Sequence, residues 1–420
     1  MLRLIYTLLL SLVAPFFLYG LYKKKSGKPG VGKRWKEHFG VTPKLETSQS
    51  PIWLHAVSVG EVIAATPIIK ALKAKHPQQA ILVTTTTSTG AEQVAKLGNL
   101  VEHRYMPLDF GFALKGFLKT VKPSQLLIME TELWPNTLHH VASAGIPITV
   151  MNARLSQRSY QRYAKVKGVF SMMSKHLDKV LCQHQDDAQR FIQLGIPESK
   201  VQVTGSVKFD IQVPDAAFKQ GQQLRQELGE KRPVWIAAST HAGEDEQVLD
   251  AHNQILTEFP SALLILVPRH PERFQSVAQL SSEKGFSTVT RTSGQAANSC
   301  QVYLADTMGE MMTLIEAADI CFMGGSLAGD KVGGHNLLEP AALAKPSITG
   351  PSFFNFTDIT HQLTQAKATA IAENSTQLAD EVKHLFGNSE RMLDMGHHAL
   401  EVVNINKGAL NTTITFIEGA

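Results

Sequence analysis

Short apolar runs alternate with longer amphipathic stretches along most of this chain, and this alternation restricts the fold more than any other feature. Between residues 51 and 212 the runs are rich in Ile, Val and Leu. They lie at Ile52–His55, Ala80–Thr85, Gln125–Met129, Ile146–Met151, Val180–Cys182 and Val201–Gly205. Helical patterns such as residues 90–97 and 113–121 separate them. Strands that alternate with helices predict βαβ units and a parallel sheet.

A second series of the same kind begins after a polar linker, residues 213–232, whose Val213-Pro214-Asp215 is typical of a hinge. Its runs lie at Val234–Ala238, Leu263–Val267, Ser287–Thr290, Val302–Leu304, Ile320–Met323, Ser347–Ile348 and Ala368–Ile371. A length of 420 residues suits two domains. The sequence therefore predicts an α/β protein with two doubly wound, Rossmann-like lobes, residues 51–212 and 233–420, which face each other across a cleft.

The first 22 residues predict a membrane-anchor helix, and residues 23–50 predict a basic linker behind it. Leu4–Tyr22 carries no charged residue and is close to the ~20 residues that a membrane-crossing helix needs. Basic residues are concentrated directly after it, at Lys23, Lys24, Lys25, Lys28, Lys33, Arg34 and Lys36. A basic flank stays on the cytoplasmic side, so we expect the rest of the chain to be cytoplasmic.

Two other interpretations of this segment stay open. A cleaved signal peptide carries its basic residues before the apolar run and a small-x-small motif after it, but here only Arg3 precedes the run and lysines follow it. A helix that lies on the membrane, with its apolar side immersed, also fits, because Pro15 interrupts the run. Both the anchor and the surface helix attach the protein to a membrane.

Charge and cysteine content argue against several other classes of protein. The formal net charge of +4 is small for this length and does not favour a nucleic-acid partner. Cys182, Cys300 and Cys321 are widely separated, and no Cys or His spacing typical of a metal site accompanies them. We therefore expect a reducing compartment and no disulfide framework.

Glu61 stands where the first predicted strand turns into a helix, within His55–Pro67, "HAVSVGEVIAATP". Ligands of open α/β sheets bind beyond the carboxyl ends of the strands, which is where this corner lies. An acidic residue in the first turn of a helix also has a purely structural explanation, because it interacts favourably with the helix dipole. We expect that dipole to keep Glu61 ionised, so that it can act as a general base on a hydroxyl. Gly60 permits close approach of a ligand or an unusual backbone angle.

Further polar residues follow other strands of the first lobe. Glu130 and Glu132 point the same way on an extended chain, which is costly unless a cation or sugar hydroxyls lie between them. The structural alternative is an ion pair with Arg154 or another basic group. Lys208 follows Gly205-Ser206 near the hinge, where an anion-binding turn and a plain surface lysine are both possible.

In the second lobe, Arg269 comes directly after a long buried strand, where its paired donors suit a phosphate or carboxylate. An arginine that merely extends from the end of the sheet is the structural alternative. Residues 306–311 follow the next strand and open a helix, whose first N–H groups could bind an anion.

Glycines form the other candidate site of this lobe. Gly324–Ser326 follows a strand, and Gly333–Asn336 precedes a helix that contains Glu339. Backbone amides of such loops can bind a phosphate, and a later glutamate can bind ribose hydroxyls. His270 and His335 are interpreted as hydrogen-bonding residues and not as metal ligands, because no second ligand stands at a suitable spacing.

Taken together, the motifs resemble one enzyme family. They are "SVGE", "METELWPN", "NARLS", "TGSVKFD", "ASTHAGEDE", "VPRHPERF", "DTMGEM" and "GGHNLLEPAA", in this order behind an N-terminal anchor. In this order they are similar to those of 3-deoxy-D-manno-octulosonic acid (Kdo) transferases, the glycosyltransferases of lipopolysaccharide inner-core assembly. The similarity covers nearly the whole chain. It implies the two-lobed GT-B glycosyltransferase fold.

The resemblance also implies an activity: inverting transfer of Kdo from CMP-Kdo to the lipid A precursor (lipid IVA) at the cytoplasmic face of the inner membrane. It implies Glu61 as the base, with Glu130 and Lys208 stabilising the transition state, and it requires no metal or other cofactor. The implied CMP-Kdo contacts are Pro268, Arg269, Met308, Gly309, Glu310, Asn336, Leu337, Leu338 and Glu339. Residues 328–332 form a longer linker than the family pattern has, so no role is assigned to Asp330 or Lys331.

Two other functions fit the same predicted fold. A UDP-sugar epimerase or another GT-B nucleotide-sugar enzyme would use both lobes, and a non-catalytic binding protein would use the cleft alone. A soluble epimerase has no use for Leu4–Tyr22, and a binding protein needs no carboxylate at Glu61. The anchor and its lysines therefore favour the transferase.

Overall fold

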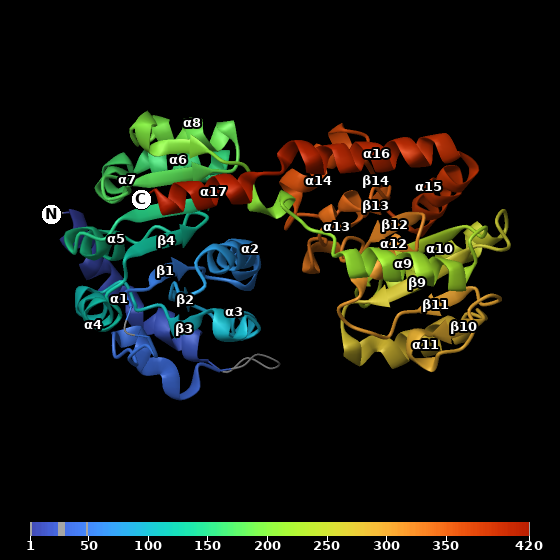
Figure 1. The fold of residues 1–420 in the computed structure, drawn as a ribbon, viewed down its shortest axis with the longest axis horizontal. Coiled ribbons are helices and arrows are strands. Elements are labelled where there is room, and N and C mark those ends of the chain that lie inside the picture. The colour runs from blue at the N-terminus through green and yellow to red at the C-terminus, as the bar shows by residue number, and fades with distance from the viewer. Residues whose placement is uncertain (1, 24–29, 48, 420) are drawn as a thin grey trace. The chain divides into compact units, whose positions relative to one another are not determined.

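The chain folds into two compact units, each built around a parallel sheet (Figure 1). The computed structural model describes residues 2–23, 30–47 and 49–419. The first unit comprises residues 1–210 and 407–420, and the second comprises residues 211–406. Lys24, Lys25 and Lys28 of the predicted basic linker lie outside the described residues.

The first unit contains a seven-stranded parallel sheet with the order β3-β2-β1-β4-β5-β6-β7. The strands are β1 Ile52–His55, β2 Ile81–Thr85, β3 Glu102–Tyr105, β4 Gln125–Met129, β5 Ile148–Ala153, β6 Lys179–Cys182 and β7 Val201–Val203. Strand order reverses between β1 and β4, which pair in parallel from Ile52 opposite Gln125 to His55 opposite Ile128. The fold class predicted from the alternation is confirmed.

Helices cover both faces of this sheet and bury its alternating side chains. They are α2 Val59–Lys75, α3 Ser88–Ala95, α4 Gly111–Val121, α5 Pro135–Ser143, α6 Gln157–Lys165, α7 Lys167–Ser174 and α8 Gln185–Gln193. Trp53 of β1 packs with Phe117 of α4 on one face, and Leu54 packs with Ile68 of α2 on the other. This two-sided burial explains why the strands are apolar runs instead of alternating ones.

The second unit has a sheet of the same kind, with the order β10-β11-β9-β8-β12-β13-β14. Its strands are β8 Val234–Thr240, β9 Leu263–Pro268, β10 Thr288–Thr290, β11 Val302–Leu304, β12 Ile320–Met323, β13 Ser347–Thr349 and β14 Thr369–Ile371. Its helices are α9 Asp215–Leu228, α10 Asp245–Leu256, α11 Phe274–Glu283, α12 Met311–Glu316, α13 Leu338–Ala342, α14 Thr357–Gln365, α15 Ser375–Gly387 and α16 Ser389–Asn406. All seven strands overlap the predicted runs, and order reverses between β8 and β12.

The boundaries between the two units differ from the lobe boundaries that the sequence predicted. Most of the predicted linker, residues 213–232, is helix α9, which packs against α12 inside the second unit. The last helix, α17 Ala409–Glu418, belongs to the first unit, although the second lobe was expected to extend to residue 420. The reason is apolar burial, because Ile414 and Ile417 lie in the core cluster that contains α2.

Helix α1, Leu2–Tyr22, lies along the first unit and packs against α5 and α7. The side chains on its more buried stripe are Arg3, Tyr6, Thr7, Leu10, Ala14, Leu18 and Leu21. Tyr6 donates a hydrogen bond to Asp109, and at the other end of the helix the Tyr22 hydroxyl lies 2.8 Å from His38 Nδ1. Contacts at both ends hold the helix against the unit over most of its length.

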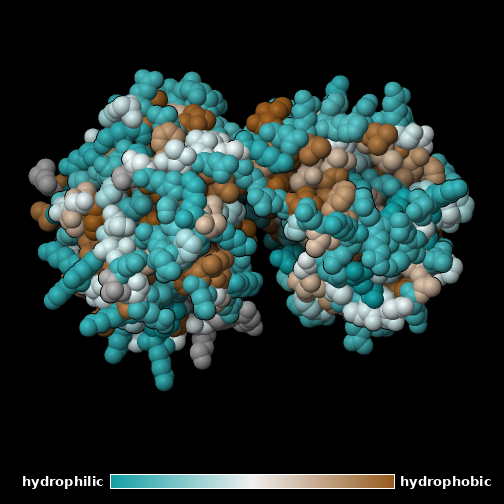
Figure 2. All heavy atoms as spheres, viewed as in Figure 1, coloured by the Kyte–Doolittle hydropathy of each residue, from teal (hydrophilic) through white to brown (hydrophobic). Residues whose placement is uncertain are grey.

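The opposite stripe of α1 is apolar and exposed. Its large exposed side chains include Leu4, Leu8, Leu12, Phe16 and Tyr19. By length and composition α1 could cross a membrane. The face of the two units seen in Figure 2 is mostly hydrophilic, with hydrophobic residues in small patches. An exposed apolar stripe of this length on α1 is typical of a surface that contacts a membrane or another protein.

Asp210 fixes α17 on the first unit, because its carboxylate accepts hydrogen bonds from the backbone N–H groups of Gly408 and Leu410, both at 2.7 Å. We predict that Asp210→Ala costs about 1 kcal/mol of the unfolding free energy and increases hydrogen exchange in residues 409–418. Denaturant unfolding and hydrogen-exchange mass spectrometry measure both effects. Asp215→Ala, at an exposed position, is the matched control, and equal exchange in the two variants would contradict the prediction.

Candidate active site

Glu61 lies in the first turn of α2, directly beyond β1 at the point where strand order reverses. Its Oε2 accepts a hydrogen bond from the backbone N–H of Val57 at 2.8 Å, and its Oε1 accepts one from Ser58 Oγ at 2.9 Å. Ser58 Oγ in turn accepts from the Glu61 backbone N–H at 3.4 Å, so that Ser58 caps the start of α2. Gly60 has no left-handed backbone angle, and only Ser58 Oγ lies within 4 Å of where its Cβ would be. The corner therefore opens onto free space.

Burial changes the acid strength of Glu61. The residue is 8% exposed, and burial raises its pKa from 4.5 to about 7. The hydrogen bonds from Val57 and Ser58 oppose this rise, and the charges of Glu130 and Glu132 add to it. The expectation that the helix dipole keeps Glu61 fully ionised is therefore wrong near neutral pH, because desolvation outweighs the dipole. A carboxyl group that titrates near neutrality suits proton transfer.

Glu130 follows β4, the strand beside β1, and has a left-handed backbone angle, φ 58°. A side chain other than glycine rarely adopts this conformation, and such strain is concentrated at functional sites. Its backbone N–H is bonded to the carbonyl of Met151 at 2.9 Å, which holds the turn in place. Glu132 is half-buried, and burial together with Glu130 raises its pKa. Glu61, Glu130 and Glu132 thus lie close enough for their charges to interact.

Lys208 lies in a short 3₁₀ helix, η4 Val207–Phe209, which follows β7 and packs against α2 and α17. Asn152 holds this helix, since its Oδ1 accepts from the Val207 N–H at 3.3 Å. Asn152 is fully buried, has a left-handed φ of 50°, and its Nδ2 has no hydrogen-bond partner among the described residues. Lys208 itself is half-buried, at the same sheet edge as Glu61.

Basic and imidazole side chains gather at the corresponding edge of the second unit. Arg269 is exposed directly beyond β9. Burial raises the pKa of Glu339 to about 7, although the positive charge of Arg269 acts in the opposite direction. His241 Nε2 and His335 Nε2 are 2.9 Å apart, so one nitrogen donates and the other accepts. His270 packs edge-on against His241, with ring centroids 5.2 Å apart. Burial lowers the pKa of His335 to about 4, so it is neutral here.

The glycine loops do not offer the free amides that the sequence suggested. Glu244 is fully buried and accepts from the N–H groups of Gly325, Ser326 and Leu327 at 2.7, 2.9 and 2.7 Å. The Gly334 N–H is bonded to the Gly325 carbonyl at 2.8 Å. The expected phosphate cradle is therefore wrong for these amides, because a carboxylate of the protein already occupies them.

His241 and Glu244 lie in the motif "ASTHAGEDE", but no role was predicted for either residue. Both follow β8 at the reversal of strand order, so the rule applied to Glu61 could have found them. Arg273 belongs to the same corner, but it is paired with Asp245 and donates to the Thr240 carbonyl at 2.8 Å. Arg269 and His270 are both exposed at this corner, whereas His241 and His335 are half-buried.

The other predicted CMP-Kdo residues differ in exposure. Met308 is 57% exposed and Gly309 has φ 86°, beyond β11, which lies next to β9. Glu310 is paired with Arg291 through two bonds of 2.8 Å, which lower its pKa. Of the four remaining predicted residues, Pro268, Leu337 and Leu338 are buried and Asn336 is half-buried. The Asn336 Oδ1 accepts a hydrogen bond from the Leu338 N–H at 3.2 Å.

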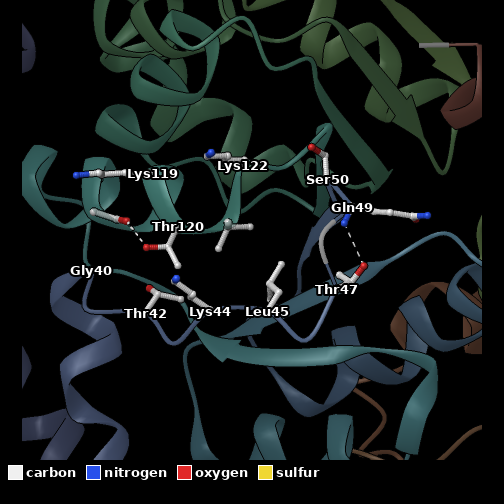
Figure 3. Close-up of a pocket in the computed structure, with 12 residues that line it drawn as sticks. Gly40, Thr42, Lys44, Leu45, Thr47, Gln49, Ser50, Lys119, Thr120 and Lys122 are labelled. Carbon is white, nitrogen blue, oxygen red and sulfur yellow. Dashed lines mark hydrogen bonds between the residues drawn. The ribbon is translucent and has the colours of Figure 1, made fainter.

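A basic hollow of about 700 Å³ lies elsewhere on the first unit (Figure 3). Residues from 40–47 and from 49–50, which precede β1, and the end of α4, which precedes β4, form its walls. Lys44, Lys119 and Lys122 line it, but they belong to the amino ends of the strands. It is therefore separate from the Glu61 corner.

Two doubly wound units, each with a reversal of strand order in its parallel sheet, define the class of the protein as one with the GT-B fold. The chain has the fold of the UDP-GlcNAc 2-epimerase from Neisseria meningitidis, with a TM-score of 0.57 and 13% identity over 89% of this chain and 100% of that one. That identity is too low to indicate more than the fold.

Sequence comparison identifies the family. A family model described as 3-deoxy-D-manno-octulosonic-acid transferase matches residues 33–211. The 3-deoxy-D-manno-octulosonic acid transferase of Haemophilus influenzae is 40% identical over 99% of this chain and 98% of its own length. That of Bordetella pertussis is 32% identical, also over 99% and 98%. The chain belongs to the Kdo transferase family of glycosyltransferases.

The raised pKa of Glu61 makes the stability of the protein depend on pH. The folded state binds this proton more tightly than the unfolded chain, so the stabilisation is complete below about pH 4.5 and is lost as pH rises through about 7. We predict that Glu61→Gln gains roughly 2–3 kcal/mol over wild type between pH 5 and pH 8, since one pKa unit is about 1.4 kcal/mol.

Denaturant unfolding of both proteins at the two pH values measures this difference. Glu198→Gln, at an exposed position, is the matched control and should track wild type. A gap between Glu61→Gln and wild type that does not change with pH would show that Glu61 has an ordinary pKa.

Proposed function

We propose that this protein transfers Kdo from CMP-Kdo to the lipid A precursor (lipid IVA) in lipopolysaccharide biosynthesis, with inversion at the anomeric carbon. Family membership supports the sugar and the donor, and the motif order supports the acceptor. One observation carries the mechanism, which is the buried Glu61 carboxyl with a pKa of about 7 at an open corner beyond β1.

In this proposal the Glu61 carboxylate removes the proton from an acceptor hydroxyl as that oxygen attacks the anomeric carbon of Kdo. The bond from that carbon to the CMP phosphate breaks, and its electron pair leaves with CMP. Ser58 and the Val57 N–H hold Glu61 in position for this step. A fixed base near the ambient pH is effective because it needs little energy to reach its active protonation state.

Glu130 and Lys208 would act on the charges that develop during transfer. The Kdo ring gains positive charge as the bond to phosphate weakens, and a nearby carboxylate stabilises it. The ammonium group of Lys208 suits the carboxylate of Kdo. On the second unit, Arg269 and the histidines around His241 suit the phosphate of CMP, and Glu339 suits the ribose hydroxyls.

The anchor supports an acceptor that resides in a membrane. Because α1 is held against the first unit at both ends, we propose that it lies in the plane of the membrane, with Leu8, Leu12 and Phe16 immersed. The acceptor-binding unit would then rest at the cytoplasmic face of the inner membrane. No separate span is needed for this attachment.

The proposed base is tested by Glu61→Gln and Glu61→Ala. We expect Kdo transfer to fall at least about a hundredfold in both, because general-base catalysis contributes ~10²–10⁴. The assay uses CMP-Kdo and tetraacylated lipid A precursor, with mass analysis of the product. In wild type, kcat/KM should rise with pH up to about 7 and then level off, since only the carboxylate accepts a proton.

CMP binding provides the control for these variants. Calorimetry should give Glu61→Gln and wild type the same CMP affinity, because Glu61 belongs to the first unit and the proposed nucleotide residues belong to the second. Transfer at a near wild-type rate by Glu61→Gln would disprove its role as the base.

The donor site is tested by Arg269→Ala. Loss of a charged phosphate contact should weaken CMP-Kdo binding about tenfold or more, with calorimetry as the measurement. Arg158→Ala, an exposed arginine of the first unit, is the matched control and should bind the donor like wild type. Donor affinity that is unchanged in Arg269→Ala would remove this residue from the nucleotide site.

A further inference from the structure

A mainly apolar pocket of about 690 Å³ lies between α1 and the rest of the first unit. The last turns of α1 form one wall, with Leu18, Gly20 and Leu21. The 3₁₀ helix η1, Gly32–Phe39, forms a second wall, where Trp35 and Phe39 meet edge to face with ring centroids 5.7 Å apart. Its volume lies in the range of small-molecule sites.

The third wall of the pocket reaches the catalytic corner. It consists of residues 87–89, which follow β2 and begin α3. Thr87 Oγ1 donates to the Val57 carbonyl at 3.4 Å, and the Val57 N–H donates to Glu61 Oε2 at 2.8 Å. The pocket and the Glu61 carboxyl are therefore joined through a single residue, Val57.

The composition of the pocket fits a hydrocarbon chain and not a charged group. Lys23, beside the end of α1, is the one charged residue among the described residues that line it. The other described lining residues are aliphatic, aromatic, glycine or hydroxyl side chains. Trp35 is 46% exposed, although burying a side chain of this size would be favourable. A ligand that covers Trp35 would remove this exposed apolar area from water.

We propose that this pocket binds one acyl chain of the lipid acceptor. The inference rests on the proposed function and adds a specific chain-binding site to it. Two observations select this occupant: α1, whose outer stripe is apolar, forms one wall, and the Glu61 corner adjoins another. A chain held here keeps the lipid partly out of the membrane while its sugar hydroxyl lies at Glu61. The pocket then selects acceptors by their acyl chains.

The experiment compares two acceptors, the tetraacylated lipid A precursor and the same phosphorylated sugar backbone without acyl chains, in one detergent. Two variants alter the pocket. Trp35→Ala removes an apolar wall, and Gly20→Leu fills the space, since nothing lies within 4 Å of the Cβ position of Gly20. We expect both to raise KM for the tetraacylated acceptor about tenfold with kcat little changed. With the deacylated acceptor, both variants should have the same kcat/KM as wild type.

Phe112→Ala is the matched control, because Phe112 is a 62% exposed aromatic residue of α4 outside the pocket. It should leave KM for the tetraacylated acceptor near that of wild type. Equal increases in KM for Phe112→Ala and the pocket variants would overturn the inference in favour of general membrane attachment. Equal kcat/KM of wild type for both acceptors would also overturn it.

The outcome for the proposed function is separate. If wild type transfers Kdo to neither acceptor, the proposed function fails, and the chain-binding site fails with it. If wild type transfers Kdo to the tetraacylated acceptor and the pocket variants retain its KM, only the chain-binding site is disproved.

Discussion

The parallel pairing of β1 with β4, and of β8 with β12, is the constraint on which both candidate sites depend. At each pair the connections run to opposite sides of the sheet, so the loops beyond the strands separate and leave space. In the first unit Glu61 follows β1 and Glu130 follows β4, and in the second unit His241 follows β8. Glu61 and Glu130 are far apart in sequence, and the strand order brings them to one edge of their sheet.

Within the first unit, two opposing effects act on a single carboxyl group. The start of α2 offers hydrogen bonds and a favourable dipole to Glu61, which would keep it acidic. Burial removes water from the same group, and two neighbouring carboxylates repel its charge. Burial has the larger effect, and the result is a group that can take up or release a proton near neutral pH. The same effect acts on His335 in the second unit, where burial favours the neutral ring and therefore lowers the pKa.

Much of this architecture could be predicted from the sequence, because buried parallel strands are apolar on both faces and so stand out as short runs. Strand β3, Glu102–Tyr105, was missed because it is a polar edge strand. The position of Glu61 was predictable, but its pKa was not, since burial depends on neighbours from β4. The glycine loops were misinterpreted because nothing in a glycine pattern indicates that Glu244 occupies the amides. Helix α17 was assigned to the wrong unit because an apolar helical pattern does not indicate which core the helix joins, and α17 joins the core of the first unit.

The return of α17 to the first unit has a consequence for protein synthesis. The second unit is one continuous segment, residues 211–406, and all of it leaves the ribosome before α17 does. The first unit, although most of it is made first, lacks Ile414 and Ile417 of its core until α17 has been made. The nascent chain therefore finishes its second unit before its first, and a partly apolar surface beside α2 stays uncovered in the meantime. A chain whose synthesis stops before α17 is made would therefore have a complete second unit and an incomplete first unit.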